Sequence, residues 1–454
     1  MDTLLLSSIR RWLGSAANQE AFDKAFGLPS LDGYGNCIGS IDVLNKGERS
    51  FLNPYDLLSD ILRVRTKGID DDFELIAAVA AAVLSRNFRG DFLVRQRLKW
   101  SQHVRRLERE GMFRKMYRMS VTSFDKLVNL LRPWLQVNLK QSRNASKGNQ
   151  PIVPEIIMHC TLRYLAGGAL HDIRVCAGLS VSSFYRAVRR GIDAVNACSS
   201  LAIKFPVTID ELMTSASEFE RLSSHGIING CIGAVDGWLC QIRVPSAHEV
   251  TRVKSYFSGH YQCYGVNVQA TCDARCRFTS LSVICPSATL DSKSFYASNI
   301  YNTISQLPAG FFVVGDNAYT LSSTLLIPYS GATKLNPSRD AFNFFLSQLR
   351  IRIEQAFGML VMKWRIFKRP LEVKFWRTTI IIEAAFRLHN FCINNNECAD
   401  MISAPCNPES FAPSYVEHLD PLEDAVEGSK KRLVDLIKSD GRVRPRHNII
   451  RNSF

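Results

Sequence analysis

Three acidic residues stand in settings where carboxylates could bind metal ions. Asp236 interrupts an apolar, strand-like run, CIGAVDGWLCQIRV, Asp316 ends a second apolar run, FFVVGDNAY, and Glu354 lies in the middle of a long helix pattern. An unpaired carboxylate buried in a central strand would cost several kcal/mol, and a metal ion or a cationic partner offsets that cost. Two carboxylates from strands and one from a helix can hold two divalent cations for in-line attack at a phosphate.

Each of the three carboxylates also has a simpler interpretation. Asp236 begins an Asp-Gly pair, which is common in hairpins, and Asp316 lies in a Gly-Asp-Asn segment, which is common in loops. Glu354 follows Arg350 by four residues, a spacing that gives exposed ion pairs worth a few tenths of a kcal/mol. Taken together, in the order strand, strand and helix, the three residues favour a metal-dependent site for phosphoryl transfer.

The net charge indicates a polyanionic partner. The 454 residues carry 56 Lys and Arg against 42 Asp and Glu, a formal net charge of +14, and such an excess favours nucleic acid through phosphate neutralisation and counterion release. The longest apolar stretch, residues 75–84, is about half as long as a bilayer span, and residues 1–12 lack a signal-peptide pattern. We therefore expect an intracellular protein without a membrane partner. The 13 cysteines form no C-x-x-C pair, which favours reduced thiols over a zinc site.

Composition divides the chain into four parts. Residues 1–90 carry no interpretable motif, residues 91–205 are basic and helix-prone, and residues 401–454 form a flexible tail with a basic end. In residues 206–400 three strand candidates, a helix, a strand and a long helix follow one another. This order is that of an RNase H-like α/β domain, with a mixed sheet and helices on both faces, preceded here by an all-α region.

Two helical segments of residues 91–205 are candidates for DNA binding. Residues 92–119 interleave Arg and Lys with aromatic residues, which fits either a solvated amphipathic helix or a surface that grips the DNA backbone. Three further helix patterns, with Gly178 at the turn and Ser180 or Ser182 as N-cap of the third, have helix-turn-helix spacing. A purely structural helical bundle is the alternative. The residues that the third helix would present to DNA are Ser182, Tyr185, Arg186, Arg189 and Arg190.

The long helix pattern covers about residues 342–367. An apolar stripe at helical spacing predicts one face against the sheet, and Glu354 lies beside that stripe, at the edge of the buried face. The members of the stripe are Phe345, Leu349, Ile353, Leu360 and Trp364. The basic residues expected to contact phosphates near the site are Arg350, Lys363 and Arg365.

The chain resembles the Harbinger-type (PIF) transposases, a family of transposase-derived nucleases. The similarity runs from about residue 120 to 397 and rests on GAVDGWLCQI, YGVNVQATCD, SATLDSKSF, VVGDNAY followed by LLIPY, RIRIEQAFGMLVMKWRIF and RLHNFC, in the family's order. It implies that Asp236, Asp316 and Glu354 form a DDE triad that binds Mg²⁺ or Mn²⁺. Asp291 matches a further acidic position and would be either a metal ligand or a structural helix N-cap.

The resemblance implies a DDE transposase, an endonuclease that cuts and joins DNA by two-metal phosphoryl transfer. Its substrates would be terminal inverted repeats and a small A/T-rich target, and its protein partners would be further copies of itself and a Myb-like accessory protein. The basic end of the tail fits nuclear import, so we expect a nuclear protein. Two other functions stay open. One is a host-adopted, catalytically silent relative that binds DNA or chromatin, and the other is a metal nuclease unrelated to transposition.

The chain also departs from the family pattern. It has Gly-Asp-Asn-Ala-Tyr at residues 315–319, where the family tends to have Gly-Asp-Ser-Gly-Tyr, and Leu290 where the family has His. Neither change removes a carboxylate of the triad. Loss of backbone flexibility at Ala318 would weaken catalysis without altering the metal ligands.

Overall fold

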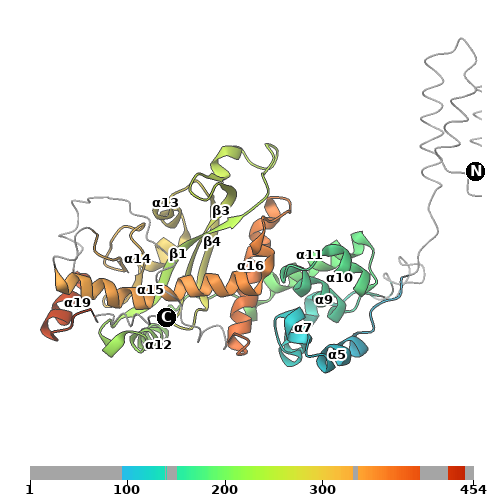
Figure 1. The fold of residues 1–454 in the computed structure, drawn as a ribbon, viewed down its shortest axis with the longest axis horizontal. Coiled ribbons are helices and arrows are strands. Elements are labelled where there is room, and N and C mark those ends of the chain that lie inside the picture. The colour runs from blue at the N-terminus through green and yellow to red at the C-terminus, as the bar shows by residue number, and fades with distance from the viewer. Residues whose placement is uncertain (1–94, 139, 141–150, 331–335, 399–427, 445–454) are drawn as a thin grey trace, which may run out of the picture. The chain divides into compact units, whose positions relative to one another are not determined.

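The computed structural model describes residues 95–138, 140, 151–330, 336–398 and 428–444 (Figure 1). The chain divides into two units, residues 1–93 and 94–454. The expectations for residues 1–90 and for most of the tail lie outside the described residues. No helix within the described ranges is long and apolar enough to cross a bilayer.

The first described elements are all helices. They are α5 (Trp100–Arg109), α6 (Phe113–Tyr117), α7 (Val121–Leu135), α9 (Pro154–Leu165), α10 (Leu170–Ala177) and α11 (Val181–Ala197). Gly178 ends α10 with a left-handed φ of 67°, and a Cβ there would lie 2.0 Å from the carbonyl oxygen of Gln96, so the turn requires glycine. The Ser180 side chain accepts a hydrogen bond from the N–H of Ser183, so Ser180, not Ser182, is the N-cap of α11.

A mixed sheet follows the helices. Its strands are β1 (Cys231–Gln241), β2 (Phe257–Ser258), β3 (Cys263–Cys272), β4 (Phe278–Pro286), β5 (Phe312–Val314) and β6 (Leu325–Leu326). β3 pairs antiparallel with β1, β2 and β4, whereas β5 runs parallel to β1 and β6. The three strand candidates are confirmed as β1, β3 and β4, which pair antiparallel in that order. The sequence does not predict β2 and β6, because two residues are too few for a periodic pattern.

Helices cover both faces of the sheet (Figure 1). One face packs against α15 (Pro337–Lys363) and α16 (Trp376–Asn394), and the other packs against α12 (Ile209–Glu220), α13 (Asp291–Tyr296) and α14 (Asn299–Ser305). Side chains alternate along β1, so Ala234 lies in the core beneath α15 while Val235 lies in the core with α12, α13 and α14. The prediction of a mixed α/β sheet with helices on both faces is therefore confirmed.

The long helix α15 begins earlier than the sequence pattern indicates. Its N-cap is Asn336, whose side chain accepts hydrogen bonds from the N–H groups of Ser338 and Arg339, and Pro337 occupies the first helical position. Every member of the expected apolar stripe is buried, with at most 2 % of its surface exposed. The members are Phe345, Leu349, Ile353, Leu360 and Trp364. The stripe therefore fixes which side of α15 faces the sheet.

A buried carboxylate joins the start of α7 to the segment after α16. Glu397 Oε1 accepts hydrogen bonds from the Ser120 N–H at 3.0 Å and the Ser123 hydroxyl at 2.7 Å. Glu397 Oε2 lies 3.2 Å from Arg114 Nη2. Burial opposes ionisation of Glu397, but the hydrogen bonds from Ser120 and Ser123 outweigh burial and lower its pKa. The charged form of Glu397 therefore stabilises the fold.

Replacing this carboxylate tests its contribution to stability. We expect Glu397→Gln to lower the free energy of unfolding by about 2 kcal/mol at neutral pH, because hydrogen bonds to a charged group are lost. The folded-state pKa lies below the unfolded value, so the contribution is present above about pH 4.3 and is lost as pH falls through the folded pKa. Urea unfolding at several pH values measures the difference.

The exposed pair of Arg106 with Glu110 provides the matched control. Glu110→Gln should change stability by less than about 0.5 kcal/mol. A stability difference between the wild type and Glu397→Gln that stays constant from about pH 6 to about pH 3 would contradict a role for the charge.

Candidate active site

Asp236 and Asp316 approach each other at the carboxyl end of β5. Asp236 lies within β1, opposite Ala270 of β3, where the pairing of β1 with β5 has already ended. Asp316 follows β5 by two residues, and its Oδ1 accepts a hydrogen bond from the Ala318 N–H at 2.9 Å. β1 continues without a break through Asp236 and Gly237. The hairpin interpretation of Asp236 is therefore wrong, whereas Asp316 does begin a tight loop.

Burial and like charge raise the pKa values of both aspartates. For Asp236 burial is the largest cause and the charge of Asp316 is the next, while the Gly237 N–H, 2.8 Å from Oδ1, and Arg350 oppose the rise. Burial also raises the pKa of Asp316, against the Ala318 N–H and Arg350. Burial and like charge therefore make the ionised form of each aspartate costly, and a bound cation would remove that cost.

Glu354 lies on α15 and forms an ion pair with Arg350, one turn earlier. The two side chains are only 17 % and 25 % exposed, so this is not the solvated pair of the simpler interpretation. The charge of Glu354 also contributes to the raised pKa of Asp316. Because Arg350 lowers the pKa of Asp236 and Asp316 as well, one guanidinium is the counter-ion of three carboxylates.

The carboxylates fit a divalent cation by their chemistry, although they do not yet form a complete ligand set. Carboxylate oxygens are the ligands that Mg²⁺ and Mn²⁺ prefer. Within the described part of the chain, no three His, Cys, Asp or Glu side chains are close enough together to hold a metal ion. Glu354 would have to approach Asp236 and Asp316 to complete the set, and its ion pair with Arg350 engages one of its two carboxylate oxygens.

Asp291 is held against the opposite face of β1. Alternation along the strand directs Asp236 toward α15 and Gly237 toward α13. Asp291 Oδ1 accepts hydrogen bonds from the side-chain amides of Asn267 at 2.8 Å and Gln269 at 3.0 Å. A Cβ at position 237 would lie 2.2 Å from Asp291 Oδ1, so glycine permits this approach. Asp291 therefore reaches Asp236 electrostatically without sharing its face of the sheet.

The network around Asp291 extends to the loop that follows Asp316. The buried Tyr319 hydroxyl donates to Gln269 Oε1 at 2.7 Å, and Gln269 Nε2 donates to Asn267 Oδ1 at 2.9 Å.

The first helical residue of α13 is Asp291 itself, and its side chain makes no cap hydrogen bond, so the N-cap interpretation is wrong. Sequence reasoning missed Asn267, Gln269 and Tyr319, although two amides at alternate positions of an apolar strand were a visible signal.

The predicted DNA contacts on α11 divide into exposed and anchored side chains. The exposed members are Ser182, Tyr185, Arg186 and Arg189. Arg190 instead donates hydrogen bonds to the backbone carbonyls of Trp134, at 3.2 Å, and Gln136, at the end of α7. These bonds attach α11 to α7 and engage two of the three guanidinium nitrogens, so Arg190 anchors the helix and its role as a DNA contact stays a prediction.

The prediction that Lys363 contacts a phosphate needs correction. Only 5 % of Lys363 is exposed, and its ammonium donates to the backbone carbonyls of Arg118 at 3.0 Å and Glu397 at 2.9 Å. It cannot contact a phosphate, because chain segments distant in sequence cover that part of α15. Arg365 is exposed and packs beside Gly167 in the turn between α9 and α10, so it stays available to DNA.

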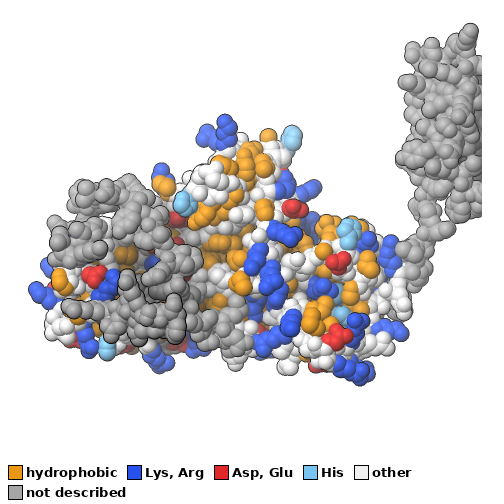
Figure 2. All heavy atoms as spheres, viewed as in Figure 1, with side chains coloured by type: hydrophobic (Ala, Val, Ile, Leu, Met, Phe, Trp, Pro, Cys, Tyr) orange, Lys and Arg blue, Asp and Glu red, His pale blue; other side chains and the backbone are white. Residues whose placement is uncertain are grey.

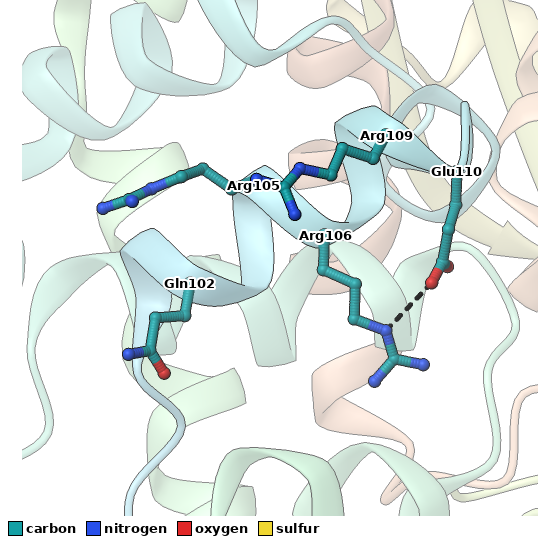
Figure 3. Close-up of a pocket in the computed structure, with 5 residues that line it drawn as sticks. All are labelled: Gln102, Arg105, Arg106, Arg109 and Glu110. Atoms are coloured by element: carbon teal, nitrogen blue, oxygen red, sulfur yellow. Dashed lines mark hydrogen bonds and ion pairs between the residues drawn. The ribbon is translucent and has the colours of Figure 1, made fainter.

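Helix α5 has one packed face and one basic face. Its Trp100 ring packs against aromatic rings of α6 and α7. The residues around the open pocket on its other face are Gln102, Arg105, Arg106, Arg109 and Glu110 (Figure 3). Arg106 pairs with Glu110 at 3.0 Å, and Arg105 and Arg109 form no ion pair with any residue that the structure describes. The solvated-helix and DNA-gripping interpretations both stay predictions.

Comparison with known proteins identifies the nature of the sheet region. Residues 235–390 match the model of a family described as DDE superfamily endonuclease. This span contains Asp236, Asp291, Asp316 and Glu354, and α11 lies outside it. No curated protein and no solved structure matches the chain. The match supports a transposase-derived nuclease family, whose members generally use divalent metals and whose activity implies a DNA substrate.

Removing one of the two aspartates should stabilise the protein in the absence of a cation. The folded-state pKa values of Asp236 and Asp316 lie above the unfolded value near 3.9. Below that pH both carboxyl groups are protonated and do not repel each other. As pH rises through the folded pKa they ionise, and the folded protein loses stability. We expect Asp316→Asn to raise the melting temperature in EDTA at neutral pH by about 2 °C, or about 1 kcal/mol, and to have no such effect near pH 3.

Mn²⁺ should reverse the order of the two melting temperatures, so that the wild type melts above Asp316→Asn. Binding to the folded state raises the melting temperature of the wild type and should do so much less in Asp316→Asn. Asp435→Asn, on the exposed face of α19 (Gly428–Ser439), is the control and should match the wild type. A lower melting temperature for Asp316→Asn in EDTA would show that repulsion between the aspartates is not the dominant effect.

Two glycine substitutions test the approach of Asp291 to β1. Gly237→Ala places a Cβ 2.2 Å from Asp291 Oδ1 and 2.7 Å from Gln269 Nε2, and we expect a loss of about 1–3 kcal/mol from overpacking. At the helical Gly358 a Cβ meets nothing within 4 Å, so Gly358→Ala should stabilise by up to about 1 kcal/mol. Urea unfolding measures the stability change of each variant. Equal changes in the two variants would contradict the close approach of Asp291 to β1.

Proposed function

We propose that the protein is a Harbinger-type DDE transposase, a metal-dependent endonuclease with an RNase H-like domain that cuts and joins DNA at transposon ends. The observation that carries the proposal is the meeting of Asp236 and Asp316 at the end of β5 with Glu354 of α15, around the guanidinium of Arg350. The family match at residues 235–390 supports the same chemistry.

The three carboxylates of the proposed triad would have different roles, because they lie on different elements. Asp236 and Asp316 would hold the divalent ions, and Glu354 would complete the ligand set after leaving Arg350. Bound Mg²⁺ or Mn²⁺ supplies an activated water or DNA 3′-hydroxyl as nucleophile and stabilises the leaving oxygen. Arg350, released from Glu354, would contact the phosphate. Asp291, held on the other face of β1 by Asn267 and Gln269, would shape the site through its charge instead of sharing an ion with Asp236.

The helical segment would recognise the DNA. In this proposal α10 and α11 form a helix-turn-helix, and α11 presents the exposed Ser182, Tyr185, Arg186 and Arg189 to the terminal inverted repeats. Arg365 would contact the backbone nearby. The net charge of +14 supports a DNA partner. Assembly as a homo-oligomer, a Myb-like accessory protein, an A/T-rich target and action in the nucleus complete the proposal.

The ion pair between Arg350 and Glu354 supports a second candidate function. In this closed state Arg350 engages Oε1 of Glu354, and no three ligand side chains among the described residues are close enough together to hold a metal ion. A host-adopted relative that binds DNA or chromatin without cutting would tolerate such a closed state permanently. The two functions differ in whether the wild-type protein cleaves DNA at all.

A plasmid assay with matched variants distinguishes them. Wild type, Asp316→Asn, Glu354→Gln and the control Asp435→Asn are incubated with supercoiled plasmid and Mn²⁺, and nicking and DNA retention are scored in the same samples. We expect wild type and Asp435→Asn to nick, and both site variants to lose about 100-fold or more of the activity with unchanged retention.

Each outcome has a direct interpretation. Equal nicking by wild type and by the two site variants would rule out the proposed triad. Retention of plasmid by all four proteins without nicking would favour the adopted DNA-binding protein.

A further inference from the structure

An exposed tryptophan lies between two arginines where α11 meets α16. Trp376, the first residue of α16, is 53 % exposed. The guanidinium carbon of Arg377 lies 5.2 Å from the centroid of its ring, and that of Arg189, from α11, lies 5.5 Å away. The two helices are attached nearby, because Asn196 Nδ2 donates to the Ile380 carbonyl at 2.9 Å. The arginines therefore meet on one indole although 188 positions separate them in sequence.

This arrangement places two positive charges on one ring. Two guanidiniums on one ring repel each other, and neither forms an ion pair with a described acidic residue. Burial is the main cause that lowers the pKa of Arg377, Asp193 opposes it, and Arg189 adds to it. Arg186 is exposed on the same helix. Lys and Arg side chains gather along α16 and over the adjoining helices in Figure 2. The surface suits an anion.

We propose that Trp376 holds Arg189 and Arg377 as a two-guanidinium clamp for a DNA backbone phosphate. Guanidinium groups bind phosphate oxygens in planar, paired hydrogen bonds. Cation–π contacts with Trp376 restrict the rotamers of both arginines before DNA arrives, which lowers the entropy cost of binding. Trp376 is thus a positioning residue, and the arginines are the contacts.

The clamp joins two parts of the chain on one duplex. Arg189 comes from α11, outside the family match, whereas Trp376 and Arg377 lie inside it. A phosphate bound between them would fix the distance along the DNA from the proposed recognition helix to the carboxylates. The inference rests on the proposed function for the identity of the polyanion as DNA.

Binding of a labelled DNA duplex of arbitrary sequence, measured by fluorescence anisotropy over a range of salt, tests the clamp in the full-length chain. We expect Trp376→Leu to weaken binding about 5- to 10-fold at low salt and to reduce the slope of log affinity against log salt by about 1, the change for one lost phosphate contact. Trp376→Tyr keeps an aromatic face and should retain most of the affinity. Trp134→Leu, at another partly exposed tryptophan whose ring has no cation–π contact among the described residues, should bind like the wild type.

A double-mutant cycle tests the mechanism itself. In a chain with Arg189→Gln and Arg377→Gln, Trp376→Leu should cause no further loss, because the groups that it positions are absent. Wild-type affinity in Trp376→Leu, an equal loss in Trp134→Leu, or an undiminished effect in the double-arginine background would each overturn the clamp.

The plasmid assay separates this inference from the proposed function. Nicking by the wild type together with wild-type DNA affinity in Trp376→Leu would refute the clamp and leave the nuclease intact. A clamp-dependent affinity without nicking would refute the nuclease and leave the clamp. Wild-type protein that does not retain duplex DNA would overturn both.

Discussion

Repulsion between Asp236 and Asp316 is the constraint that the sheet and α15 oppose together. Neither carboxylate would adopt its position alone, because burial and like charge both favour the protonated form. The backbone pairing of β1 with β3 and β5 fixes the first aspartate, and the loop bond to Ala318 fixes the second. Arg350 then reduces the cost from α15. A site arranged in this way favours a cation, since a cation relieves the repulsion that the fold imposes.

The face of β1 opposite Asp236 is also closely packed. Gly237 lacks the Cβ that would collide with Asp291, so the carboxylate can approach the strand that carries Asp236. Gln269 connects Asp291 to Tyr319, and Tyr319 belongs to the loop that begins at Asp316. Helix α13, strand β3 and this loop therefore share one hydrogen-bond network. A displacement of any one of them would change the electrostatic surroundings of the two aspartates.

Contacts between the helical segment and the sheet region are polar as well as apolar. Glu397 binds the start of α7, Lys363 binds backbone carbonyls from two chain segments, and Asn196 connects α11 to α16. These bonds hold the exposed face of α11 at a fixed place relative to α16. The pairing of Arg189 with Trp376 is a consequence of that packing. DNA that binds α11 would therefore meet a surface that includes residues of α16.

The sequence by itself determined strands β1, β3, β4 and β5, the mixed α/β architecture and the buried face of α15, because periodicity and turn chemistry are local properties. It also predicted that Asp236 lies on a strand and that Asp316 follows one. Only the tertiary structure decided that Arg350 also acts on Asp236 and Asp316, that Lys363 is buried and that Trp376 meets an arginine of α11. The physical reason is that a side chain's partners come from segments far away in the chain, and whether a charge faces solvent, a carbonyl or another charge depends on how those segments pack.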